Sequence, residues 1–105
     1  MAESTKIYMG VPQTVKLPVY DTTPGTRVTA TKMILTNTDE TKDAKVTVTV
    51  NTMDVMKNID VKAGETKILD IYIVLEPKDV LSLQQDTLNA VNVTIGGLSE
   101  KILAY

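Results

Sequence analysis

The chain has 105 residues, a formal net charge of −2, and no His or Cys. This length fits one domain with one hydrophobic core, and 11 basic against 13 acidic residues leave no basic stripe of the kind that binds nucleic acid. Without His or Cys, the chain cannot form a Ser-His-Asp or Cys-His catalytic group, or a thiolate metal site. We therefore expect one domain over residues 1–105 that is not an enzyme and has no catalytic residue, no cofactor, no metal site and no nucleic-acid partner.

The composition favours β-structure, since the chain contains 13 Val, 8 Ile and 16 Thr, and β-branched side chains prefer a pleated sheet. The first predicted strands cover residues 7–9, 14–20 and 27–36. Thr23-Pro24-Gly25-Thr26 precedes the third strand and suits a type II turn. Within that strand the apolar positions change parity, so the pattern leaves open which parity faces the core, and burying both would need a bulge near Thr31-Lys32. The residues concerned are Val28 and Ala30 on one parity, and Met33 and Leu35 on the other.

The polar segment from Asn37 to Asp43 predicts a loop between two hairpin strands. Three carboxylates in this loop invite a glycosidase-like or Ca²⁺-binding interpretation: Asp39, Glu40 and Asp43. They lie in the most polar part of the chain, where nothing nearby would raise the pKa of an acid. We therefore expect a solvated loop.

The next strand, residues 44–51, contains the alternating run Val46-Thr47-Val48-Thr49-Val50. This alternation predicts that the valines face a core, and that Thr47 and Thr49 face solvent or a neighbour. A short strand over 58–61 follows, and then the turn Lys62-Ala63-Gly64-Glu65.

The strand predicted over 66–75 is apolar on both faces. Leu69, Ile71, Ile73 and Leu75 form the core face, and the opposite face carries Ile68, Asp70, Tyr72, Val74 and Glu76. An outward apolar patch commonly marks a subunit interface, so Tyr72 and Val74 are candidate interface residues. The alternative is that this strand lies in the middle of a sandwich and is covered by the chain's own segments.

The remaining predicted strands cover residues 80–83, 89–95 and 101–103, with Gly96-Gly97 as the turn before the last. A helix between Pro77 and Val91 is the less favoured alternative to strand. The whole pattern predicts an all-β fold: a single antiparallel β-sandwich or jelly-roll-like domain of about eight short strands.

The N-terminal segment 1–12 and the C-terminal segment 99–105 are more apolar than chain ends usually are. They either complete the domain's own sheets or pair as edge strands with an adjacent copy. The N-terminus lacks the apolar region of a signal peptide, and no apolar run is long enough to cross a bilayer, so we expect a protein made in the cytoplasm without membrane contact. The candidate contact residues of the two segments are Ile7, Tyr8, Met9, Ile102, Leu103 and Tyr105.

The order of short motifs along residues 13–98 resembles small bacteriophage virion structural proteins, in head-associated and tail-associated versions. The motifs are Gln13-Thr14-Val15, Tyr20 through Pro24-Gly25 to Val28-Thr29, Ile34 to Thr38, Ala63-Gly64-Glu65-Thr66, Ile73 to Val80 and Val91 to Gly97. Lys78 stands where that pattern usually has glycine.

The resemblance implies a non-enzymatic β-sandwich subunit of a phage particle, displayed in many symmetric copies. It also implies partners among other virion proteins, such as major capsid or tail proteins, and a homo-oligomer within the particle. We favour a capsid-decoration or head-associated role over a tail or baseplate role. The alternative is a carbohydrate-binding or adhesin-type module, but an aromatic content of 4%, all of it tyrosine, provides few of the flat platforms that bind sugars.

Overall fold

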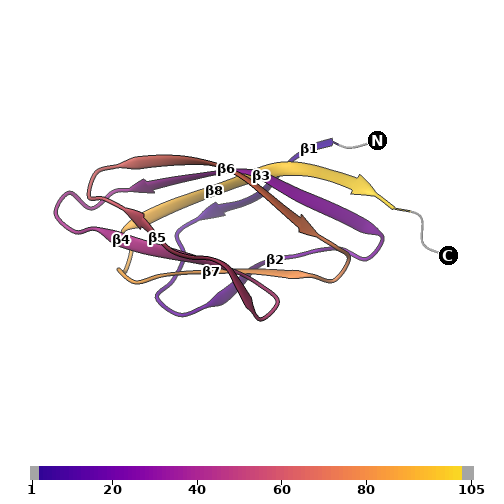
Figure 1. The fold of residues 1–105 in the computed structure, drawn as a ribbon, viewed down its shortest axis with the longest axis horizontal. Coiled ribbons are helices and arrows are strands. Elements are labelled where there is room, and N and C mark those ends of the chain that lie inside the picture. The colour runs from indigo at the N-terminus through magenta and orange to yellow at the C-terminus, as the bar shows by residue number, and fades with distance from the viewer. Residues whose placement is uncertain (1–2, 103–105) are drawn as a thin grey trace.

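The computed structural model describes residues 3–102, which form two four-stranded antiparallel sheets packed face to face (Figure 1). No described residue is helical, and thus no described helix is long and apolar enough to cross a membrane. The predicted all-β sandwich is confirmed, and β7 shows that the segment after Pro77 returns as a strand. The strands are β1 (Glu3–Gly10), β2 (Leu17–Asp21), β3 (Thr26–Asn37), β4 (Ala44–Val50), β5 (Met53–Val61), β6 (Thr66–Leu75), β7 (Val80–Gln85) and β8 (Val91–Lys101).

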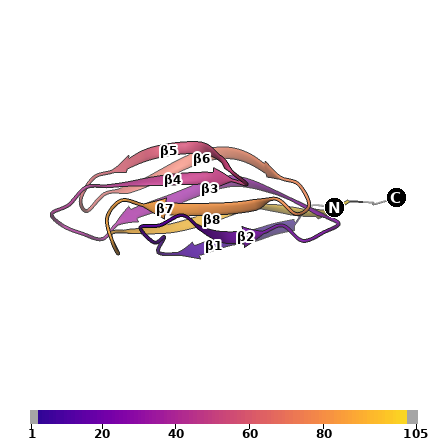
Figure 2. The same ribbon diagram turned by 90° about the horizontal axis from the view of Figure 1, so that it is seen from below.

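The strand order is that of a jelly roll. Sheet A has the order β1-β8-β3-β6, and sheet B the order β2-β7-β4-β5. Each early strand pairs antiparallel with its counterpart from the other end of the chain: β1 with β8, β2 with β7, β3 with β6, and β4 with β5. The chain is therefore one long nested hairpin wrapped into two layers. β1 and β2 lie along one side of the sandwich, and β5 and β6 along the other (Figure 2).

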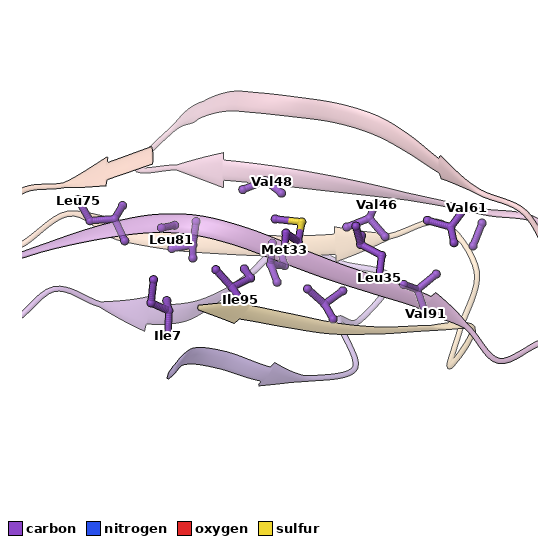
Figure 3. Close-up of a cluster of buried hydrophobic side chains, with 14 of the residues drawn as sticks. Ile7, Met33, Leu35, Val46, Val48, Val61, Leu75, Leu81, Val91 and Ile95 are labelled. Carbon is purple, nitrogen blue, oxygen red and sulfur yellow. The ribbon is translucent and has the colours of Figure 1, made fainter. Parts of the chain in front are cut away.

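The core lies between the sheets and is filled by aliphatic side chains from both (Figure 3). Val46 and Val48 are fully buried, as the alternation predicts, and Val50 is half-buried. The expectation that Thr47 and Thr49 face solvent or a neighbour is only partly right, because both are buried on the outer side of β4. The Thr49 hydroxyl donates to Asp54 Oδ1 at 2.8 Å, so the irregular β5 covers this face and satisfies its polar atoms.

The structure resolves the open phase of the third strand, because the bulge that burial of both parities would need is present. The register of β3 shifts between Ala30 and Lys32 against both of its neighbours, β6 and β8. As a result, Val28 and Ala30 before the shift and Met33 and Leu35 after it all face the core. The same shift turns Ile34 toward solvent.

The turn predicted at Gly96-Gly97 is wrong. Both glycines lie within β8, which runs unbroken from Val91 to Lys101 and replaces the two strands predicted over 89–95 and 101–103. At Gly97 a Cβ atom would lie 1.9 Å from the carbonyl oxygen of Thr29. Glycine is needed here because β3 and β8 approach closely beside the register shift, so it serves sheet packing and not chain reversal.

The tight turns follow the sequence. Gly25 and Gly64 have φ of 82° and 72°, and each turn is closed by a backbone hydrogen bond, from Thr26 N to Thr23 O and from Glu65 N to Lys62 O. The same geometry recurs at Glu76–Asp79, where Asp79 N donates to Glu76 O at 3.0 Å and Lys78 has φ of 73°. Lysine thus occupies a left-handed position that suits glycine.

We predict that Lys78→Gly stabilises the fold. The substitution relieves left-handed strain of about 1–2 kcal/mol but adds freedom to the unfolded chain, which offsets part of the gain. The expected net effect is a rise of about 0.5–1 kcal/mol in the free energy of unfolding, measured by urea titration. Lys78→Ala, which keeps a Cβ atom, serves as the control and should give no such rise.

Candidate interaction surface

β6 is the last strand of sheet A, so only β3 pairs with it. Its side chains alternate as predicted: Leu69, Ile71 and Ile73 pack against the core, while Ile68 and Tyr72 point outward with 62% and 79% of their surface exposed. No described segment covers the Tyr72 side chain, so the alternative of internal packing is wrong for this residue. Val74 is half-buried beside Thr29 of β3.

An apolar row crosses the outer face of sheet A from edge to edge. Met9 of β1 is paired with Thr94 of β8, Thr94 with Ile34 of β3, and Ile34 with Ile68 of β6. Met9 is 61% exposed and Ile34 37%. The surface beside Met9 and Ile34 is hollowed by about 470 Å³, with Val11 and Asn92 also on its lining. Directly opposed side chains on one face act as a unit, so this row forms a continuous strip.

A charged pair separates this row from a second apolar patch near the other end of the face. Lys32 Nζ lies 3.2 Å from Asp70 Oδ1, and both side chains are largely exposed. Beyond the pair, Leu98 of β8 is 42% exposed and opposes Thr29, which in turn opposes Val74. The outer face of sheet A therefore offers two apolar patches with a neutralised pair between them.

The terminal residues expected to make contacts are placed differently from one another. Ile7 is buried in the core, and Tyr8 is half-buried against it. Only Met9 of the β1 candidates is strongly exposed. Ile102 follows β8, is half-buried, and donates its backbone N–H to Gly25 O at 2.9 Å. Leu103 and Tyr105 lie outside the described residues.

Within the described residues, the structure does not bring the contact candidates together into one site. Met9 belongs to the apolar row, Tyr72 and Val74 to the β6 edge, and Ile102 to the far end of sheet A. Ile34 and Leu98 are exposed on this face but were not among the candidates predicted from the sequence. The parity change in the third strand could have indicated that Ile34 faces outward. Leu98 was not considered because the sequence predicted a turn at Gly96-Gly97, just before it.

The carboxylate loop is held by structural hydrogen bonds. It crosses from β3 in sheet A to β4 in sheet B, so the expected hairpin connection is wrong. Asp39 Oδ1 accepts hydrogen bonds from Thr41 N, Thr41 Oγ1 and Lys42 N at 2.8–3.0 Å, and Asp43 Oδ1 accepts from Ala63 N at 2.9 Å. The bonds from Thr41 and Lys42 hold the pKa of Asp39 below its ordinary value. An acid that stays ionised is unsuited to donate a proton in catalysis.

Asp39 should make the stability of the fold depend on pH in acid. A carboxyl whose pKa is lowered by folding contributes stability above its unfolded pKa, near 3.8, and loses it as the pH falls through the folded value. We predict that Asp39→Asn is less stable than the wild type at pH 7 and that this gap closes below about pH 4. Urea midpoints at a series of pH values measure it. A gap that stays constant down to pH 2 would contradict the role of the charge.

Neither a protein-family model nor a curated protein matches the chain in sequence. Among solved structures, a chain in the crystal structure of the T13 IBDV viral particle is similar over 97% of this chain, with a TM-score of 0.57 and 10% sequence identity. This chain spans 31% of the length of that chain. At such low identity the likeness shows the fold alone, which is that of a β-sandwich also found in a chain of an icosahedral virus particle.

Proposed function

We propose that this protein is a non-enzymatic structural subunit of a virus particle, and more specifically a bacteriophage virion protein. In this role it binds other particle proteins and copies of itself, and many weak contacts add up to firm attachment. A head-associated subunit that decorates the capsid surface is the version we favour. The protein is made in the host cytoplasm and ends in the virion.

The observation that carries the proposal is the outer face of sheet A. All four of its strands carry exposed apolar residues. These are Met9 on β1, Ile34 on β3, Ile68 and Tyr72 on β6, and Leu98 on β8. A protein that functions alone gains nothing from such a face, whereas a subunit buries it against its neighbours. The fold likeness to a viral-particle chain and the motif pattern along residues 13–98 support the same role.

The site chemistry favours a structural role over catalysis. Within residues 3–102, no group of three or more acidic side chains is arranged to hold a metal ion. In the most acidic loop, Asp39 accepts hydrogen bonds from the loop's own backbone, and Asp43 accepts one from Ala63 N in the turn after β5. Of the three tyrosines within residues 3–102, Tyr72 is exposed, whereas Tyr8 and Tyr20 are half-buried against the core. One exposed ring in the described part of the chain does not make the flat platform of a sugar-binding module.

The proposal is tested by the protein content of purified particles. Particles released from cells that carry this gene are banded on a density gradient and analysed by quantitative mass spectrometry, and an antibody against the chain locates it by electron microscopy. We expect the chain in the particle band at many copies, on the head surface. Its absence from the particles, with free protein left in the lysate, would overturn the proposal.

A further inference from the structure

We infer that β6 pairs antiparallel with β6 of a second copy, around a two-fold axis at Ile71, so that two A sheets join into one continuous sheet. The inference rests on the proposed function, in which copies of the chain assemble, and it names the contact. Pairing along a sheet edge uses main-chain hydrogen bonds for affinity and side-chain register for specificity.

The four edge strands differ in how they are protected against such pairing. Proteins protect sheet edges with short strands, proline, bulges or charged residues. β2 has 5 residues, among them Pro18, β1 carries Lys6 next to a register shift, and β5 has two register shifts and a left-handed residue, Asn58.

β6 is the least protected of these edges. It has 10 residues and no proline. Its register against β3 shifts once, between Asp70 and Ile73, yet exposed and half-buried side chains still alternate from Thr66 to Ile73. Its central charge, Asp70, is already paired with Lys32. A long edge with apolar side chains on both faces is a template for another strand.

Both faces of β6 also need cover. On the inner face, Leu69, Ile71 and Ile73 are only half-buried, although they pack against the core. On the outer face, Ile68 and Tyr72 are 62% and 79% exposed. A strand added at this edge brings a neighbour to both rows at once, whereas a partner docked on the outer face would cover only one.

The charges of β6 and the alternation of its side chains select the register of the pairing, and they favour a second copy of β6 as the added strand. Inward residues must oppose inward residues, so the symmetric pairings that use the whole strand are centred on Asp70 or Ile71. Centring on Asp70 places two carboxylates opposite one another, which is destabilising. Centring on Ile71 places Asp70 opposite Tyr72 of the second copy and keeps each carboxylate with its own Lys32. The same register matches Ile68 with Val74 and Leu69 with Ile73, apolar against apolar. The strand is therefore complementary to itself.

Single cysteines test this register, because the chain has no cysteine of its own. Opposed residues of paired strands have Cβ atoms about 4.5–5.5 Å apart and diagonal ones about 7–8 Å apart, and a disulfide needs about 3.5–4.5 Å. Under mild oxidation, Ile71→Cys should therefore give a covalent dimer well before Tyr72→Cys does. Met53→Cys, at a position of β5 where the side chain is 72% exposed, is the control for background crosslinking. Crosslinking of Ile71→Cys no faster than this control would overturn the pairing, and fastest crosslinking of Asp70→Cys would overturn the register.

A second variant tests the contact without a cysteine near the core. Ile68→Lys adds a charge to an exposed position of the edge, so the fold should persist, as circular dichroism would show. We expect its dimer dissociation constant, from light scattering over a wide concentration range, to rise by at least about tenfold. Met53→Lys is the matched control and should dimerise like the wild type. Equal dimerisation of the two variants would count against the β6 edge.

The two proposals can fail separately. A dimer crosslinked through Ile71→Cys, formed by a protein that is absent from particles, would uphold the pairing and overturn the virion role. A protein that is found on particles but shows no crosslinking above the control would uphold the virion role and overturn the pairing.

Discussion

Gly97→Ala should lower the free energy of unfolding by about 3–5 kcal/mol, which is at the severe end for a point mutation. The added methyl group would lie 1.9 Å from Thr29 O and 2.9 Å from Ala30 Cα. These are backbone atoms of β3, the strand that pairs with β8 in the middle of sheet A, so relief requires moving two central strands apart. Because domains are stable by only about 5–15 kcal/mol, part of the Gly97→Ala protein should be unfolded at modest urea concentrations.

Gly96→Ala is the control for this prediction, since it changes the same kind of residue one position earlier. There the nearest atom to an added Cβ is Thr5 O at 3.8 Å, an ordinary contact. We expect a change of less than about 1 kcal/mol in either direction, because a strand interior favours alanine over glycine. Similar urea midpoints for the two variants would mean that β3 and β8 do not require glycine at position 97.

The features of the fold that depend on local pattern could be predicted from the sequence. β6 covers the predicted residues 66–75, and the turns at Gly25 and Gly64 have the positive φ that their glycines indicate. The parity change between Val28 and Leu35 also marked the place of the register shift beside Thr31, although the pattern did not decide between one buried parity and a bulge that buries both. Alternation and turn chemistry act over a few residues, so a short window of sequence is enough to detect them.

The features that depend on distant partners could not be predicted. Gly96-Gly97 looked like a turn from the local sequence. Glycine is needed at position 97 because the backbone of Thr29, which is far away in sequence, lies too close for a Cβ atom. The alternation placed Thr49 on the outer face, but it does not show that the irregular β5 covers this face, where Asp54 accepts a hydrogen bond from the Thr49 hydroxyl. Ile7 and Met9 looked alike as apolar terminal residues, but the register of β1 against β8 shifts at Ile7, and Ile7 is buried whereas Met9 is exposed. Which apolar residues reach the candidate surface is thus decided by strand pairing, which no single segment encodes.

Gln85 is a further residue whose role emerges only from the fold, and replacing it should have the second of the large effects. Its side chain is 1% exposed. Nε2 donates to Pro12 O at 2.6 Å and to Val91 O at 3.3 Å, and Oε1 accepts from Val91 N at 2.9 Å. The Gln85 side-chain amide therefore links the loop after β1 to the start of β8 by hydrogen bonds.

Gln85→Ala leaves these backbone groups buried without partners and opens a cavity beside them. An unsatisfied buried polar group costs about 1–3 kcal/mol, and the lost packing adds to this, so we expect the free energy of unfolding to fall by about 3–4 kcal/mol. Gln85→Leu fills the space but restores no hydrogen bond, so it should recover only the packing part. Gln84→Ala, on the opposite parity of β7 and half-buried, should change stability far less. Faster hydrogen exchange at Val91 in both Gln85 variants would identify the lost hydrogen bond as the cause, whereas full recovery by Gln85→Leu would mean that packing alone matters at this position.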